Sequence, residues 1–358
     1  MFAPSRHSFA ILLKRHALEQ GKLVLQSEIG RRGIKPDWTP AIEALRWRAL
    51  KHQHAPPRAL NPEFLPVWDE KKGGAPHARA VRVRAAGQEV LLPASFFQTA
   101  AAASASDVPG IGAPAAPAAD HDEDGADGGG VTTWELLAFE QGGAPAMQKK
   151  FALENDEPED VRFHAADIGT LLARSEAVPV PDDEDAGAEH EVDEVFVPRV
   201  IAGRILQAAQ SAGAVETGGT LLGRLMRDEA RGTMAAEVLA YVPAFNAPAT
   251  LTTLTFTDEH FACVQDTLER EPCADTLIGF AHSHPSSHFC PPSCPPERRA
   301  LCPRQRAALS AADLAMIQTV FPRAYSVFLL ANLADSGPSL ACFGWAGGSV
   351  VRRPYRLV

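Results

Sequence analysis

The chain has 358 residues, of which 46% are apolar and 22% are charged, a composition typical of globular proteins with a sizeable core. The length favours two domains, or one domain with a large appendage. No apolar run approaches the ~20 residues that a membrane-spanning helix needs, and the short run at 9–13 is stopped by Lys14 and Arg15. These features argue against a membrane anchor and an export signal, so a cytoplasmic protein is expected.

Charge is divided unevenly along the chain. Residues 1–98 carry 16 Lys and Arg against 8 Asp and Glu, whereas the rest carries 18 basic against 36 acidic residues, and the net charge is −10. A basic front end fits an acidic partner such as nucleic acid, or acidic segments of the same chain. Aromatic residues do not alternate with the basic ones as they do on nucleic-acid platforms, so pairing within the chain is favoured and no nucleic-acid partner is expected.

Residues 1–98 are expected to form an N-terminal α+β domain of unknown function. The apolar residues of 9–25 have loosely helical spacing, and 41–50 is a second helix candidate with Trp47 and Leu50 on its apolar side. Residues 80–84 alternate as a half-buried strand does. After the break at Gly87, residues 89–92 are expected to pair with this strand as a hairpin.

Two stretches have the composition of linkers. Residues 99–130 are dominated by Ala, Ser, Pro, Gly and Asp, and a disordered linker is predicted there because such a stretch buries too little apolar area. Residues 179–194 form a second, acidic linker. The residues between them, 131–178, have enough apolar content for a small subdomain or for an extension of the N-terminal domain.

Residues 195–358 are predicted to form one α/β domain. Helices are expected at 197–210, at 258–268 with Thr257 as N-cap, and at 310–321 with Ser310 as N-cap. Strands are expected at 218–227, 234–242, 277–282, 325–330 and 340–345, with a further strand at 350–357.

The clearest chemical feature is the sequence Gly-Phe-Ala-His-Ser-His-Pro at 279–285. His282 and His284 are two residues apart at the end of a predicted buried strand, where side chains at such positions point to the same face. Two imidazoles can thus converge on one cation, although a hydrogen-bonded histidine pair at a strand end is the alternative.

Three other residues could complete a site. Asp313, in the first turn of the predicted helix 310–321, could be a third ligand and leave the fourth tetrahedral position of a zinc ion to water, or it could simply complement the helix dipole. Ser310 could cap this helix and also donate a hydrogen bond to an oxyanion. Glu216, ahead of a glycine-rich strand entry, could be the base for a zinc-bound water, or merely a solvated acid.

Together these motifs resemble the JAMM/MPN family of zinc metalloproteases, also called the JAB domain, in its bacterial form. Glu216 with Gly219 matches the family's Glu-x-x-Gly, 282–285 matches His-x-His-Pro and 310–313 matches Ser-x-x-Asp, in the family's order. The resemblance covers about residues 195–358. It implies a cytidine-deaminase-like α/β fold, in which a mixed β-sheet is flanked by helices.

The resemblance also implies a set of roles for these residues. The zinc ligands would be His282, His284 and Asp313, the general base would be Glu216, and Ser310 would help to stabilise the tetrahedral intermediate. The implied reaction is hydrolysis of an amide bond at the C-terminus of a ubiquitin-like modifier, by deconjugation or by precursor processing.

The implied partners are a ubiquitin-like protein or its conjugate, together with activating (E1-like) and conjugating (E2-like) enzymes. One alternative is a hydrolase acting on a sulfur-carrier protein conjugate or on a small amide. Another is a non-catalytic MPN scaffold, which is disfavoured because such scaffolds usually lack one or more of the ligands that this chain keeps.

The spacing departs from the family's pattern at one place. Between His284 and Ser310 lie 25 residues, where the family usually has about seven. The insert is rich in proline and could act as a substrate clamp or a lid. It also holds residue types that could bind a second, structural zinc ion, unless its cysteines are free thiols in a flexible loop. These residues are His288, Cys290, Cys294 and Cys302.

Overall fold

The structure is a computed structural model that describes residues 7–19, 22–53, 62–106, 131–140, 161–181, 189–244, 256–270, 273–274, 276–290, 294–295, 299, 302 and 305–358. Contacts divide the chain into two compact units. Unit 1 comprises 1–157 and 347–349, and unit 2 comprises 158–346 and 350–358. The strands form one six-stranded and one ten-stranded sheet, so the chain is a mixed α/β protein with two sheets.

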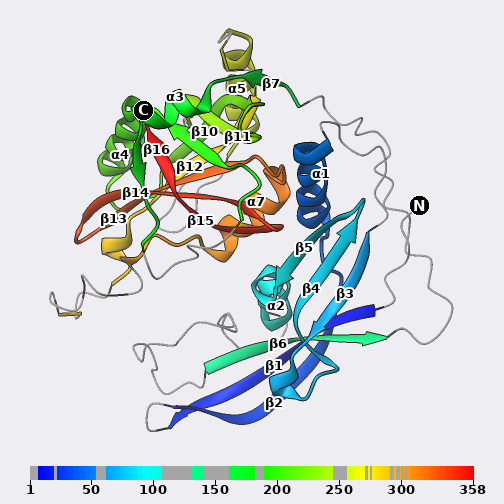
Figure 1. Ribbon diagram of the computed structural model, residues 1–358. Helices are drawn as coiled ribbons and strands as arrows, with labels where there is room; N and C mark the ends of the chain where they lie inside the picture. The colour runs from blue at the N-terminus through cyan, green and yellow to red at the C-terminus, as the bar shows by residue number, and fades with distance from the viewer. Residues whose placement is uncertain are drawn as a thin grey trace. The chain divides into compact units, whose positions relative to one another are not determined.

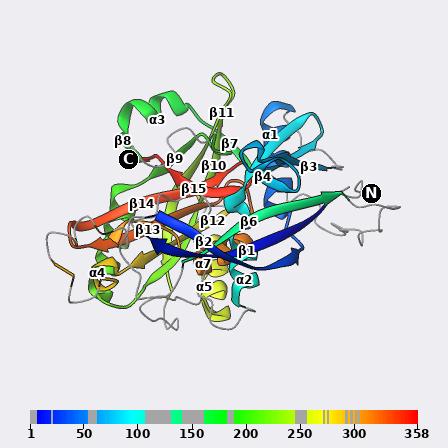
Figure 2. The ribbon, with the colours of Figure 1, turned by 90° about the horizontal axis from the view of Figure 1, so that it is seen from below.

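Unit 1 contains the six-stranded sheet. Its strands are β1 His7–Glu19, β2 Lys22–Ile34, β3 Glu63–Trp68, β4 His77–Ala85, β5 Gln88–Pro93 and β6 Val131–Glu140. Its helices are α1 Thr39–Gln53 and α2 Gln98–Ser106, with short 3-10 turns η1 Glu70–Lys72 and η2 Ala94–Phe97. The strand order is β2-β1-β6-β4-β3, with β5 paired to β4 (Figure 1). Figure 2 shows β1, β2 and β6 running side by side.

The helix predicted at 9–25 is wrong, because this segment forms β1 and the start of β2, which pair antiparallel. Phe9, Ile11 and Leu13 face one side of the sheet and enter the main core cluster of unit 1. Ala10 and Leu12 face the other side and form a separate buried cluster with Leu137 of β6. A strand that is covered on both faces is apolar at every position, so its sequence has no two-residue alternation to distinguish it from a helix.

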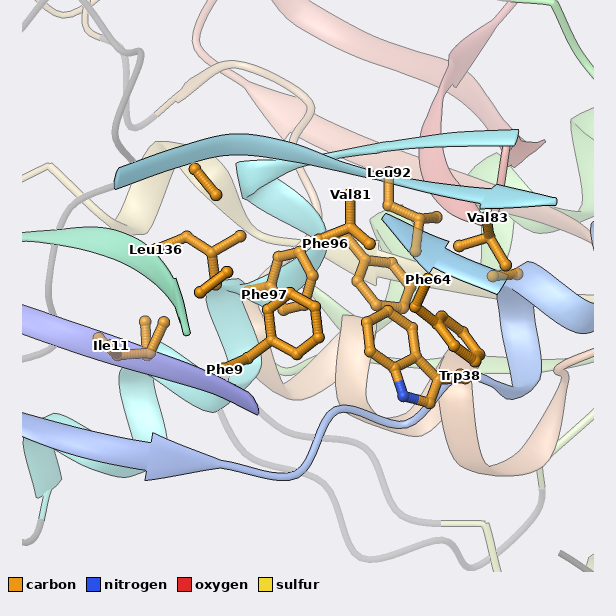
Figure 3. Close-up of a cluster of buried hydrophobic side chains, with 14 of the residues drawn as sticks. Phe9, Ile11, Trp38, Phe64, Val81, Val83, Leu92, Phe96, Phe97 and Leu136 are labelled. Atoms are coloured by element: carbon orange, nitrogen blue, oxygen red, sulfur yellow. The ribbon is translucent and has the colours of Figure 1, made fainter. Parts of the chain in front are cut away.

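The core of unit 1 is a cluster of aromatic rings between the sheet and the helices. Trp38, just ahead of α1, lies 4.3 Å from Phe64 and 5.5 Å from Phe9 between ring centroids, and it also contacts the rings of Phe96 and Phe97 (Figure 3). Such contacts between offset or edge-on rings stabilise a core beyond the area that they bury.

The other elements predicted in the N-terminal region are confirmed. The predicted helix at 41–50 corresponds to α1, where Trp47 is 2% and Leu50 9% exposed. The predicted hairpin corresponds to β4 and β5, which pair antiparallel with Val81 opposite Leu92.

The boundaries of the predicted linkers are different in the structure. Residues 99–106 belong to α2, with Ala101 and Ala105 buried, so they are not linker. Residues 107–130 and 141–160 lie outside the described residues. Residues 131–140, which lie between these two gaps, form β6 of the first sheet. The strands at 163–165 and 176–178, which follow the second gap, belong to the second sheet. Of the acidic segment, 182–188 lie outside the described residues, and Glu191 and Val192 are buried.

Unit 2 contains the ten-stranded sheet. Its strands are β7 Phe163–Ala165, β8 Glu176–Val178, β9 Glu194–Val197, β10 Gly218–Asp228, β11 Thr233–Pro243, β12 Thr276–His284, β13 Val327–Ala334, β14 Gly337–Ala346, β15 Ser349–Arg353 and β16 Tyr355–Leu357. Its helices are α3 Ile168–Arg174, α4 Arg199–Ala212, α5 Asp258–Arg270 and α7 Ala311–Val320, with a 3-10 turn η3 Ser286–His288. The strand order is β15-β14-β13-β12-β10-β11-β9-β16-β8, with β7 paired to β10.

Strand β12 lies inside this sheet, antiparallel to β10 and parallel to β13. Phe280 and Ala281 point to opposite faces, and both are 0% exposed, so the sheet is covered on both sides. On one face, Phe280 packs with Ile317 and Phe321 from α7 and the residue after it. Helix α4 contacts strands β10 to β14. The helices and strands predicted for 195–358 are confirmed with ends shifted by a few residues, except that the strand predicted at 350–357 is divided into β15 and β16 and that β9 has no predicted counterpart. Among the described helices, none is long and apolar enough to cross a membrane.

Candidate metal centre

The predicted site residues come from three elements of unit 2. His282 and His284 end β12, Asp313 lies in the first turn of α7, and Glu216 comes two residues before β10 begins. Since β10 and β12 are antiparallel, with Gly218 opposite His282, the start of β10 lies beside the end of β12. The fold thus brings together residues that are up to 97 positions apart in the sequence.

The two histidines and the aspartate converge on one point. His282 Nε2 lies 3.1 Å from His284 Nε2, and each lies 3.3 Å from an oxygen of the Asp313 carboxylate. The histidines are 3% and 6% exposed. If both imidazoles donated a proton to the carboxylate, two N–H groups would face each other across 3.1 Å. A cation among the three lone pairs removes this conflict, so the group could hold a metal ion.

The first turn of α7 fixes the orientation of Asp313. The Ser310 Oγ accepts a hydrogen bond from Asp313 N at 3.1 Å, and Asp313 Oδ2 accepts one from Ser310 N at 2.7 Å, which together form a capping box. The predicted N-cap is therefore confirmed. Burial raises the pKa of the Asp313 carboxyl, but hydrogen bonds to His282 and His284 outweigh this effect and hold the pKa well below its usual range.

Glu216 is a buried carboxyl beside this group. Its side chain is 4% exposed, and Oε1 lies 3.7 Å from His284 Nε2. Burial raises the pKa of Glu216 to about 7; the nearby His284 opposes the rise and the Asp313 charge adds to it. A carboxyl in this state can accept or release a proton near neutral pH.

Two features that place Glu216 are not apparent in the sequence alone. Thr217 N donates to Ser283 Oγ at 2.9 Å, and Ser283 N donates to Thr217 O at 2.8 Å, which ties the segment next to Glu216 to the strand of the histidines. A side chain at Gly219 would collide with the carbonyl oxygen of Val242 on β11, so glycine is required there. The only sequence signal for Ser283 is its place between the two histidines, where its side chain points to the opposite face.

The insert is partly described, and its ligand candidates are not gathered as the first group is. Among the described residues, three or more ligand atoms approach closely only at the group of His282, His284 and Asp313. The four candidates for a second zinc ion, His288, Cys290, Cys294 and Cys302, do not form such a group. All six cysteines of the chain are described, and none of them forms a disulfide. Buried Cys290 lies 3.5 Å from Gln305 Nε2.

Comparisons with known proteins do not assign this chain to a family. No family model matches the chain, and no curated protein matches it. One similar solved structure is the solution structure of a structural genomics target from Desulfitobacterium hafniense, which is 17% identical. The match covers 46% of this chain and 92% of that chain, with a TM-score of 0.33, too low to show a shared fold.

Proposed function

We propose that unit 2 is a zinc-dependent isopeptidase or peptidase of the JAMM/MPN type. In this proposal His282, His284 and Asp313 hold the zinc ion, Glu216 is the general base, and the substrate is an amide bond at the C-terminus of a ubiquitin-like modifier. The observation that carries the proposal is the position of the Glu216 carboxylate, whose Oε1 lies 3.7 Å from Nε2 of His284, one of the three candidate ligands. A purely structural metal site has no need of a fourth, protonatable residue beside it.

The spacing of the three candidate ligands is compatible with a tetrahedral zinc ion. Zinc binds imidazole nitrogen at about 2.0–2.1 Å and carboxylate oxygen at about 2.0–2.2 Å, so the ligands of a tetrahedral ion lie about 3.3–3.5 Å apart. The three separations in this site are 3.1, 3.3 and 3.3 Å. Three protein ligands leave one position open, which is the arrangement of catalytic zinc sites.

The proposed chemistry assigns separate tasks to the residues. A bound zinc ion lowers the pKa of a coordinated water to about 7 and polarises the carbonyl of the scissile bond. Glu216 accepts the proton of the attacking water and later donates it to the leaving amine, two steps for which a carboxyl with a pKa near neutral is suited. The exposed Ser310 hydroxyl accepts from Asp313 N and keeps its own proton, with which it can donate to the developing oxyanion.

The fold and the substrate class are part of the same proposal. The mixed sheet with helices against it, and the order of the three motifs, are compatible with an MPN-like domain. The substrate class follows from the resemblance of these motifs to the JAMM/MPN family. The expected partners are accordingly a ubiquitin-like protein or its conjugate, with activating and conjugating enzymes acting before the hydrolase.

The proposal is tested with Glu216→Gln in the full chain, assayed on fusions in which a ubiquitin-like protein precedes a reporter. Loss of the base is expected to slow cleavage by roughly 10²- to 10⁴-fold, while the zinc content stays at that of the unchanged chain. Glu269→Gln is the matched control, because Glu269 lies on the exposed surface of α5. Unchanged cleavage by Glu216→Gln, or a purified chain without zinc, would contradict the proposal. Bound zinc without cleavage of any fusion would favour the scaffold alternative.

A further inference from the structure

The metal ligands come from two elements that a long connection separates. His284 ends β12, and 25 residues follow before Ser310, the N-cap of the helix that carries Asp313. A chain of this length does not by itself hold its two ends in one place. Nevertheless, the Asp313 carboxylate lies 3.3 Å from both imidazoles. Other contacts must therefore fix the ends of the connection.

Asn332 on β13 bridges these two ends. It lies opposite His284 in the parallel pairing of β12 and β13, and it is 4% exposed. Its Oδ1 accepts a hydrogen bond from the Oγ of Ser286, two residues after His284. Its Nδ2 donates to the carbonyl oxygen of Gln305 at 2.8 Å, five residues before Ser310. A single amide group thus binds the connection near its beginning and near its end.

Gln305 is also held through its side chain. Gln305 Nε2 donates to Asp335 Oδ2 at 2.9 Å, and Gln305 Oε1 accepts from Asp335 N at 2.7 Å, so the two residues form a closed pair of hydrogen bonds just after β13. Arg299 joins this pair, with Nε 2.7 Å from Asp335 Oδ2 and Nη2 donating to Ser287 O at 2.7 Å. Gln305 is 5% exposed, whereas Asp335 lies at the surface, so the network is shielded from water on the Gln305 side.

The path from this network to Asp313 is short. Ala307, two residues after Gln305, is 6% exposed and belongs to the core cluster that contains Ile317 of α7. The segment between Gln305 and Ser310 therefore packs, through Ala307 and Leu309, into the same core cluster to which α7 contributes Ile317.

We propose that Asn332 and Gln305 are positioning residues of the metal centre. They anchor the connection to β13 and thereby set the position of Asp313 relative to the histidines of β12. Neither residue belongs to the ligand group, so each acts through the backbone of the connection. This inference rests on the metal centre of the proposed function, but it does not depend on the substrate.

The test replaces Gln305 with glutamate, which turns the Nε2 donor into an acceptor that faces the Asp335 carboxylate. We expect Gln305→Glu to weaken zinc binding by roughly 10- to 100-fold, the effect typical of residues that support metal ligands. It should also alter the visible absorption of the cobalt-substituted chain, which reports the geometry of the ligands. The double variant Gln305→Glu/Asp335→Asn restores a complementary pair and should restore both properties. Zinc affinity is measured by competition with a chelator.

The matched control is Gln265→Glu. Gln265 Nε2 donates to Glu269 Oε1 at 3.3 Å on exposed α5, so the same substitution creates the same conflict of acceptors away from the site. Unchanged zinc affinity and an unchanged cobalt spectrum in Gln305→Glu, with a lower melting temperature, would show that the network only stabilises the loop and would overturn the proposal. Should Gln305→Glu fail to fold, Asn332→Ser, which shortens the bridging side chain, is measured with the same two outcomes.

These readouts separate this inference from the proposed hydrolysis. A loss of affinity in Gln305→Glu supports the positioning role even if the unchanged chain cleaves no ubiquitin-like fusion. Equal zinc affinity of Gln305→Glu and the unchanged chain overturns the positioning role even if cleavage is found. An unchanged chain that binds no metal ion overturns both proposals.

Discussion

The two units differ in what they bury. Among the described residues, every buried polar or charged side chain except Ser104 belongs to unit 2. Ser104 is satisfied within its own helix, where its hydroxyl donates to Ala100 O at 2.7 Å. Unit 1 is otherwise built around aromatic and aliphatic contacts. In unit 2 some of the buried polar groups gather in two neighbouring networks, one around His282 and one around Asn332, whereas others, such as Asp228 and Arg353, lie elsewhere.

This difference bears on the proposal that unit 2 carries the chemistry. A buried polar group costs free energy unless it is hydrogen-bonded, and a buried charge costs more unless it is paired. Perturbed carboxyls such as Glu216 are typical of functional sites. The contrast in buried polar groups is therefore compatible with the proposal that unit 2 carries the metal centre.

The largest expected effect concerns the aromatic core. Phe97 is 1% exposed and lies 6.3 Å or less from the rings of Phe9, Trp38 and Phe96. Replacing it with alanine should lower the free energy of unfolding by about 3–5 kcal/mol, because it leaves a cavity. Zinc affinity should not change, since the ligands belong to the other unit. Denaturant unfolding and chelator competition measure the two quantities.

A matched substitution in unit 2 sharpens this test. Phe328 is also 1% exposed, but it packs against Phe280, two residues before His282. Phe328→Ala should destabilise the chain to a similar extent and also weaken zinc binding. If Phe97→Ala weakens zinc binding as much as Phe328→Ala does, the functional separation of the two units is wrong.

Removal of the metal should have the next largest effect. A ligand at 100 times its dissociation constant stabilises the folded state by about 2.7 kcal/mol. Chelation should therefore lower stability in unit 2 only, where hydrogen exchange of amides in β12 and α7 should become faster. Exchange in β1 and β6 serves as the internal control. Equal acceleration in both units would contradict the assignment of the metal centre to unit 2.

Acid should destabilise unit 2 through His190. The pKa of His190 is lowered to about 4, chiefly because burial disfavours the charged ring, and also because Arg353 repels it. The folded chain keeps this ring neutral, whereas the unfolded chain protonates it below pH 6.5. Above pH 6.5 the ring is neutral in both states, so His190 does not lower the free energy of unfolding. As the pH falls from 6.5 towards 4, only the unfolded chain binds the proton, and the free energy of unfolding decreases.

The loss due to His190 should be on the order of 2 kcal/mol at pH 5. In His190→Gln this loss is absent, so the unfolding free energies of variant and unchanged chain should converge, or cross, between pH 7 and pH 5. Denaturant unfolding at both pH values measures this. Parallel pH profiles of the two chains would show that His190 does not contribute.

The sequence predicts well where local signals and periodicity agree. Helix α7 is predicted to within a residue because Ser310 caps it, and the histidine pair on β12 is predicted because alternate residues of a strand share a face. The same reasoning fails at β1, where Ala10 and Leu12 are as buried as Ile11. A strand buried on both sides has no alternation, and its strand character comes from pairing with β2 and with β6, about 120 residues away.

The supporting network around the site could not be predicted from local signals. In the sequence, Gln305 is an ordinary polar residue of the proline-rich insert, and Asn332 is one that lies two residues beyond the predicted strand 325–330. Their roles depend on contacts between residues 27 and 30 positions apart. Metal ligands have characteristic residue types and spacings, whereas residues that hold a loop in place have neither.

The smallest expected effect concerns the cap of α7. Ser310→Ala removes the acceptor for Asp313 N and should lower the free energy of unfolding by about 1 kcal/mol. It should also weaken zinc binding slightly, since the first turn of α7 frays. The backbone N–H of residue 310, 2.7 Å from Asp313 Oδ2, survives the substitution and keeps the carboxylate near its place.

Unit 1 offers the matched cap. Asp37 Oδ1 accepts from Thr39 N at 2.9 Å at the start of α1, so Asp37→Ala removes a comparable side-chain acceptor there. The two variants should lose similar stability, but only Ser310→Ala should change zinc affinity, and Ser310→Thr should restore it. Equal zinc affinity in Ser310→Ala and Asp37→Ala would mean that the backbone N–H of residue 310 is sufficient to hold Asp313 in place.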